Sequence, residues 1–129
     1  MKKIIIFVFI VILFTAGYFY NKKIQTDFGT TTSIDMAGKS EVVVEMTGFA
    51  FVPEKITVNK GTKIIWINKD SVGHSIKSDP HPEHSLFPEM NSSDLSLDQS
   101  YSFIFEKEGV YSYHCDPHPR IMKGEIIVK

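Results

Sequence analysis

The chain has 129 residues, of which 43% are hydrophobic and 12% aromatic, and its formal net charge is −1. This length allows one domain at most, and the abundance of Phe, Tyr, Ile and Val favours strands. The single cysteine excludes an intramolecular disulfide. Four of the 14 basic residues lie in the first 23 positions, which leaves ten against 15 acidic residues and a net charge of −5 for the remainder. No basic stripe remains for binding nucleic acid.

The first 23 residues have the layout of a signal peptide or an N-terminal membrane anchor. A short basic start precedes residues 4–20, which are uncharged and mostly Ile, Phe, Val and Leu. As a hydrophobic helix this run would span about 25 Å, slightly less than a bilayer core of about 30 Å. No clean Ala-x-Ala cleavage site follows it, and aromatic residues precede Lys22 and Lys23, which favours an uncleaved anchor. We therefore expect an exported protein, in the periplasm or on the extracytoplasmic face of the membrane.

The remainder of the chain divides into a linker and a domain rich in strands. Residues 24–40 are rich in Thr, Ser and Gly and predict a flexible linker. From Glu41 onward, β-branched and alternating runs predict strands at 41–46, 55–58, 63–68, 101–106, 110–115 and 124–129. The run at 63–68 is the most apolar of these and predicts a strand buried on both faces. Without an amphipathic helix after residue 24, residues 41–129 predict an all-β, antiparallel β-sandwich.

Candidate metal ligands gather within eight residues near the C-terminus. Cys115, His118 and Met122 supply a thiolate, an imidazole and a thioether, which are the ligand types that redox-active copper selects. Prolines on both sides of His118 restrict the backbone and fix the direction of its imidazole. These three groups leave the coordination shell one ligand short. His74, which follows a glycine turn at the start of a short strand, is the best candidate for the missing ligand.

Three motifs in this order resemble those of a known family. They are Gly-Phe-Ala-Phe-Val-Pro at 48–53, Trp-Ile-Asn-Lys-Asp at 66–70 with a histidine six residues after the Asn, and Tyr-His-Cys-Asp-Pro-His-Pro at 113–119. Together they resemble the cupredoxins, especially the plastocyanin and amicyanin branch, over residues 41–129. The resemblance implies a Greek-key β-sandwich that binds one mononuclear copper ion. It also implies a set of ligands, namely a trigonal group of His74, Cys115 and His118 with Met122 as a weak axial ligand.

The function that the resemblance implies is one-electron transfer between Cu(I) and Cu(II), and not enzymatic catalysis. The protein would then be a monomer whose redox partners dock near His118. Three residues separate His118 from Met122, as in azurins, and Gly73 stands where azurins have a glycine whose carbonyl lies close to copper. A weak backbone contact from Gly73 is therefore included in the expected site. A copper-binding or delivery protein without redox turnover is the alternative.

Several residues around this loop have more than one interpretation. His81 and His84 could bind a second metal with Glu83 or Glu89, although histidines in a mobile loop are more often solvated. His114 is adjacent to Cys115 on a strand, so its side chain should point to the opposite face and should not share the copper.

Three further residues could have supporting roles. The backbone N–H of Ser75 could donate to the Cys115 sulfur, with a weaker side-chain brace than the Asn that many cupredoxins have there. The pair Phe87 and Pro88 could contribute to an apolar patch around His118.

Overall fold

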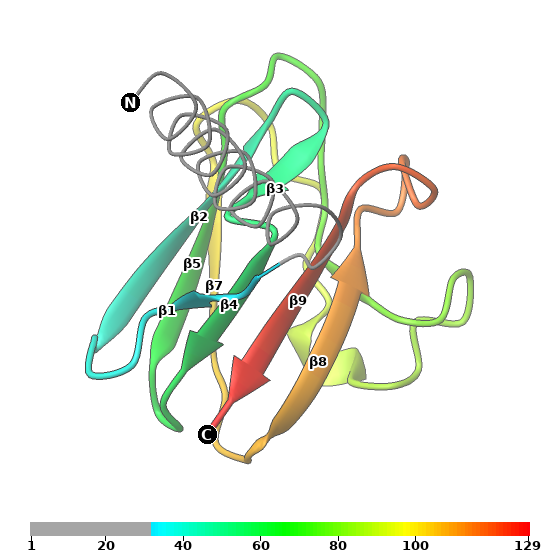
Figure 1. Ribbon diagram of the computed structural model, residues 1–129. Coiled ribbons are helices and arrows are strands. Elements are labelled where there is room, and N and C mark those ends of the chain that lie inside the picture. The colour runs from blue at the N-terminus through cyan, green and yellow to red at the C-terminus, as the bar shows by residue number, and fades with distance from the viewer. Residues whose placement is uncertain (1–31) are drawn as a thin grey trace, which may run out of the picture. The chain divides into compact units, whose positions relative to one another are not determined.

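The computed structural model describes residues 32–129, which form a sandwich of two β-sheets (Figure 1). This arrangement confirms the predicted all-β sandwich. The predicted signal or anchor at 1–23, with its apolar run at 4–20, lies outside the described residues. Between residues 32 and 129 no helix is long and apolar enough to cross a membrane.

The larger sheet has five strands and the smaller has four. The larger contains, in spatial order, β1 (Ile34–Asp35), β4 (Lys55–Val58), β9 (Lys123–Val128), β8 (Gly109–His114) and β6 (Lys77–Ser78). The smaller contains β3 (Ala50–Val52), β2 (Glu41–Thr47), β5 (Lys63–Asn68) and β7 (Ser100–Ile104). One short 3-10 helix, η1 (Pro88–Met90), lies in the long connection between β6 and β7.

Both sheets are mixed, which corrects the expectation of purely antiparallel pairing. β8 pairs antiparallel with β9 and with β6, and β5 pairs antiparallel with β7. In contrast, β2 lies parallel to β5, and β4 lies parallel to both β1 and β9. The chain crosses from β3 to β4 in the other sheet before it returns as β5, and this crossover places β5 beside β2 in the same direction.

The sandwich includes part of the segment that the sequence analysis assigned to the linker. Ile34 in β1 pairs with Ile56 in β4. The N–H of Met36 donates to the carbonyl of Thr57 at 2.8 Å, and the Met36 side chain packs against the core. Pairing with β4 therefore orders this segment before the first predicted strand begins.

The core lies between the sheets and is centred on β5 and β8. Ile64 and Trp66 are fully buried, whereas Ile65 and Ile67 between them are half-buried. The expectation that this strand is buried on both faces was therefore wrong, because only one face of the smaller sheet is covered by the other sheet. Trp66 Nε1 donates to Tyr113 Oη at 3.2 Å, and this hydrogen bond joins the two sheets across the core.

Candidate metal centre

The turn after β5 holds His74 in place through a buried asparagine. Asn68 Nδ2 donates to the carbonyls of Val72 and Leu95, both at 2.8 Å, and Asn68 Oδ1 accepts the N–H of Asp70 at 2.9 Å. His74 and Leu95 also exchange two backbone hydrogen bonds, at 3.1 and 2.7 Å. The backbone on both sides of His74 is thus held by hydrogen bonds within the protein.

Asp70 determines which nitrogen of His74 is available to a metal. Asp70 Oδ2 lies 2.9 Å from His74 Nε2, and the carboxylate also accepts the N–H groups of Gly48 and Phe49 at 2.9 and 3.1 Å. The hydrogen bond from His74, followed by that from Gly48, lowers the pKa of the Asp70 carboxyl. Because an ionised carboxylate only accepts hydrogen bonds, Nε2 carries the proton and Nδ1 keeps a free lone pair.

Three predicted ligand atoms meet at one point of the structure. Cys115 Sγ lies 3.5 Å from His74 Nδ1 and 3.5 Å from His118 Nδ1. Bonds of about 2.0 Å to nitrogen and about 2.3 Å to sulfur would place such atoms about 3.5–3.7 Å apart around one ion. The spacing of these donors, one thiolate and two imidazoles, therefore fits a single soft transition-metal ion such as copper.

The Cys115 sulfur is fully buried, and it contacts Ser75, the residue that follows His74. Burial raises the pKa of the Cys115 thiol. The Ser75 backbone N–H donates to Sγ at 3.4 Å, as expected from the sequence. Ser75 Oγ also accepts the N–H of Asp116 at 3.3 Å, so the serine side chain does brace the loop. Because the thiolate is the form that binds a metal, a metal ion bound here would displace the thiol proton.

The loop from Cys115 to Met122 is closed by its own backbone. The N–H of Cys115 donates to the Met122 carbonyl, and the N–H of Met122 donates to the His118 carbonyl, both at 3.0 Å. The Met122 side chain is fully buried at the base of this loop. Gly73, which precedes His74, is exposed.

Phe49 covers the site, a role that the sequence analysis did not assign. Its ring meets the rings of His118 and His74 edge to face, with centroids 4.9 and 5.7 Å apart, and it stays 42% exposed. Its backbone has φ of 59°, a left-handed turn conformation that the two hydrogen bonds to Asp70 hold. The 48–53 motif and a carboxylate four residues before His74 were the available signals for Phe49 and Asp70.

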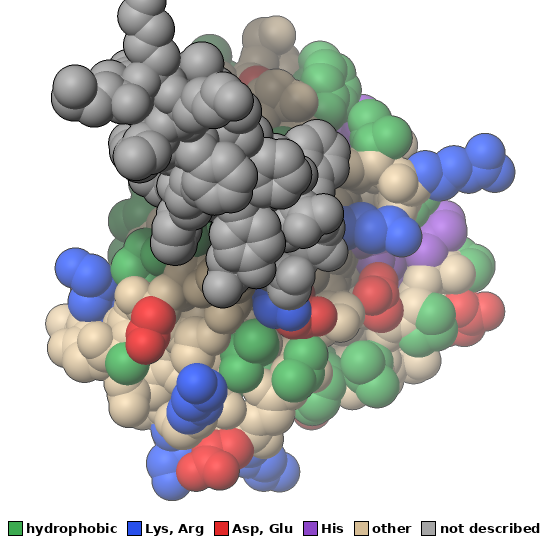
Figure 2. Space-filling view, in the orientation of Figure 1, with side chains coloured by type: hydrophobic (Ala, Val, Ile, Leu, Met, Phe, Trp, Pro, Cys, Tyr) green, Lys and Arg blue, Asp and Glu red, His purple; other side chains and the backbone are tan. Residues whose placement is uncertain are grey.

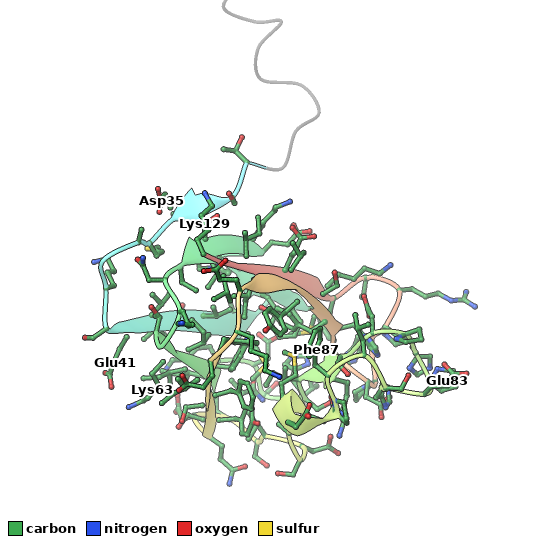
Figure 3. The ribbon with its side chains drawn as sticks, turned by 90° about the horizontal axis from the view of Figure 1, so that it is seen from below. Asp35, Glu41, Lys63, Glu83, Phe87 and Lys129 are labelled. Carbon is green, nitrogen blue, oxygen red and sulfur yellow. The ribbon has the colours of Figure 1, made fainter. Side chains whose placement is uncertain are left out.

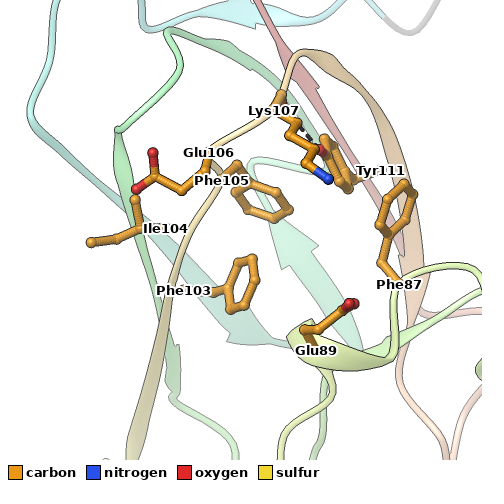
Figure 4. A pocket seen from close by; sticks show the side chains of 8 residues that line it. All are labelled: Phe87, Glu89, Phe103, Ile104, Phe105, Glu106, Lys107 and Tyr111. Carbon is orange, nitrogen blue, oxygen red and sulfur yellow. Dashed lines mark hydrogen bonds between the residues drawn. The ribbon is translucent and has the colours of Figure 1, made fainter.

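Phe87 lies elsewhere, contrary to its predicted place in a patch around His118. Its ring packs on Tyr111 at 4.3 Å between centroids. Both rings line a cavity of about 260 Å³ together with Phe105, and Figure 4 shows the three rings facing this cavity. Tyr111, in the first half of β8, lines the cavity, whereas Cys115 and His118 follow the last residue of β8, and no proposed metal ligand lines the cavity.

Comparison with known proteins gives a consistent assignment. Residues 38–129 match the family model of copper binding proteins, plastocyanin/azurin family. Amicyanin of Paracoccus denitrificans is 28% identical over 90 residues, covering 68% of this chain, and this chain spans just under two thirds (65%) of its length. Amicyanin-alpha of Methylorubrum extorquens is 28% identical over 103 residues, covering 78% of this chain and 82% of that protein.

A solved structure of a Cu(I) amicyanin variant superposes with a TM-score of 0.62 at 25% identity, covering 70% of this chain and 83% of that one. The family match spans β2 to β9, and the sandwich brings the thiol of Cys115 and the imidazoles of His74 and His118 together. The chain belongs to the plastocyanin/azurin family of copper-binding proteins.

Proposed function

We propose that this chain is a type 1 (blue) copper electron carrier that works outside the cytoplasm. His74, Cys115 and His118 would hold the copper ion, with Met122 as a weak axial ligand and a weak backbone contact from Gly73. The observation that carries this proposal is the 3.5 Å spacing of Cys115 Sγ from the Nδ1 atoms of both histidines. Bound copper supplies one-electron exchange between Cu(II) and Cu(I).

The surrounding residues favour fast electron exchange by holding the ligands still. Asp70 orients the His74 ring, and Ser75 donates to the thiolate and braces the backbone beside it. Hydrogen bonds within the 115–122 loop add a further constraint. A site with so little freedom changes its geometry little when the charge of the metal changes, so little reorganisation accompanies each electron.

His118 is the ligand closest to solvent and marks the surface for a redox partner. It is partly exposed, whereas His74 and Cys115 are buried. Phe49 lies against its ring, and Ile121, which is 69% exposed, follows it in the loop. An apolar surface around a partly exposed ligand suits a brief encounter with another redox protein. We infer that such partners dock here and that the chain is a monomer.

We propose electron transfer, and not catalysis on a bound substrate, as the role of this site. The cavity of about 260 Å³ is lined by residues of 87–89 and 103–111 and by none of the four proposed ligands. From the sequence we further propose that residues 1–23 export the protein, that 4–20 serve as its anchor, and that the functional domain is 41–129.

Addition of Cu(II) to the full chain in detergent tests the proposal. We expect an intense visible band from thiolate-to-copper charge transfer, and its loss in Cys115→Ser. A Met122→Leu variant should keep the colour and have a higher reduction potential, because it removes a ligand that favours Cu(II). A colourless one-to-one complex would instead support the copper-delivery alternative.

A further inference from the structure

A second group of candidate metal ligands lies beside the first. It consists of His81, His84, His114 and Asp116, each with one ligand atom within 4.8 Å of the other three. Histidine side chains are visible at the surface of the sandwich in Figure 2. The first two residues come from the loop after β6, and the last two flank Cys115. Antiparallel pairing of Lys77 in β6 with His114 in β8 brings these two parts of the chain together.

The composition of this group differs from the second site that the sequence suggested. Glu83 is exposed, and Figure 3 shows it at the outer edge of the molecule. Glu89 lines the cavity beside Phe87 (Figure 4). Neither carboxylate belongs to the group, and His114 and Asp116 take their place.

His114 is the residue that points most clearly to a ligand. It is 1% exposed, and its Nδ1 lies 2.6 Å from Asp79 Oδ1. With the proton on Nδ1 for that hydrogen bond, Nε2 carries a lone pair. Nε2 is buried without a hydrogen-bond partner. A carboxylate that holds one imidazole nitrogen while the other faces a cluster of donors is the arrangement found around metal-bound histidines.

The two loop histidines converge on the same carboxylate. His84 Nε2 lies 3.1 Å from Asp116 Oδ1, and His81 Nδ1 lies 3.4 Å from the same oxygen. His84 Nε2 is buried, and its approach to Asp116 lacks the geometry of a hydrogen bond. Four donors at about 2.0 Å around a tetrahedral ion would lie about 3.3 Å apart, close to both distances. Burial also lowers the pKa of His84 and favours the neutral imidazole that a metal requires.

We propose that His81, His84, His114 and Asp116 bind a second divalent transition-metal ion, Zn²⁺ or Cu²⁺, with Asp79 as the residue that orients His114. Three imidazoles and one carboxylate suit these two ions, and four protein ligands close the shell, as in structural sites. The ion would bind His114 and Asp116, the residues on either side of Cys115. Its positive charge beside the thiolate would disfavour Cu(II), so its binding should raise the reduction potential of the first site.

The direct measurement is the amount of zinc that the full chain binds in detergent after its first site has been loaded with Cu(I). We expect one Zn²⁺ per chain by elemental analysis after gel filtration, and the same count in Cys115→Ser, which excludes zinc held by the first site. A His81→Asn/His84→Asn double variant should bind zinc at least tenfold more weakly, and Asp79→Asn roughly 10–100-fold more weakly. Glu83→Gln, between the two histidines, is the matched control and should bind like the parent.

Two further readouts separate metal binding from a purely structural role. Zinc should raise the copper potential in the parent and in Glu83→Gln but not in the double variant. A second equivalent of Cu²⁺ should add an electron paramagnetic resonance signal without adding to the thiolate band. The proposal is overturned if the parent retains no zinc, or if the double variant binds it as tightly as the parent. If the double variant does not fold, as judged by the absence of the blue band after addition of Cu(II) alone, equal zinc affinity of the parent and Asp79→Asn overturns the proposal.

Discussion

Replacing Asp70 with asparagine should weaken copper binding without removing any copper ligand. The carboxylate accepts three hydrogen bonds, from His74 Nε2 and from the N–H groups of Gly48 and Phe49. An amide offers one oxygen acceptor and no charge, so it cannot satisfy all three donors. His74 is fully buried, and an Nε2–H left without its acceptor has no water to replace it.

The size of the effect follows from the role of such supporting carboxylates. Their loss typically lowers metal affinity roughly 10–100-fold, which corresponds to about 1.4–2.7 kcal/mol. We expect a loss in this range for Asp70→Asn, because both the tautomer and the orientation of His74 depend on Asp70. The blue colour should persist at saturating copper, since the thiolate ligand is intact.

Competition with a chelator of known affinity, followed at the thiolate band, measures this loss. Asp98→Asn is the matched control, because the Asp98 carboxylate pairs with Lys69 at the surface, at 2.8 Å between Lys69 Nζ and Asp98 Oδ1. Its copper affinity should equal that of the parent. An Asp70→Asn chain whose copper affinity stays within twofold of the parent would refute the role assigned to Asp70.

Three further predictions concern the stability of the sandwich. Gly124→Ala would place a Cβ 2.2 Å from Cζ of the buried Tyr113, so the free energy of unfolding in urea should fall by roughly 1–3 kcal/mol. An unchanged unfolding midpoint would contradict this packing. Tyr113→Phe removes the acceptor of Trp66 Nε1, and the same assay should show a loss of about 1–3 kcal/mol, whereas Tyr101→Phe, whose ring stacks on Trp66, should change stability less. Removal of copper should lower the melting temperature, because copper at 100 times its dissociation constant adds about 2.7 kcal/mol; equal melting curves with and without copper would count against a site formed only in the folded chain.

The ligand loop could be predicted from the sequence because its geometry is local. Cys115, His118 and Met122 lie within eight residues between two recognisable strands, and a loop this short must bring them together. The alternation of side chains along a strand also separated His114 from Cys115 correctly, since the two residues belong to different donor groups. His74 was a candidate for the remote partner from its place after a glycine turn, and the resemblance to cupredoxins strengthened that choice.

The tertiary structure decided every feature that depends on contacts between distant segments. Asp70 supports His74 because the turn between β2 and β3 folds over it, and Phe49 reaches His118 for the same reason. The second group of donors requires β6 to pair with β8, which joins residues 35 positions apart, such as Asp79 and His114. Strand alternation specifies which face a side chain occupies, but the order of strands in a sheet specifies what that face meets. The sequence alone therefore identified the loop that carries three of the four proposed copper ligands, whereas strand pairing assembled its supporting residues and the second cluster beside it.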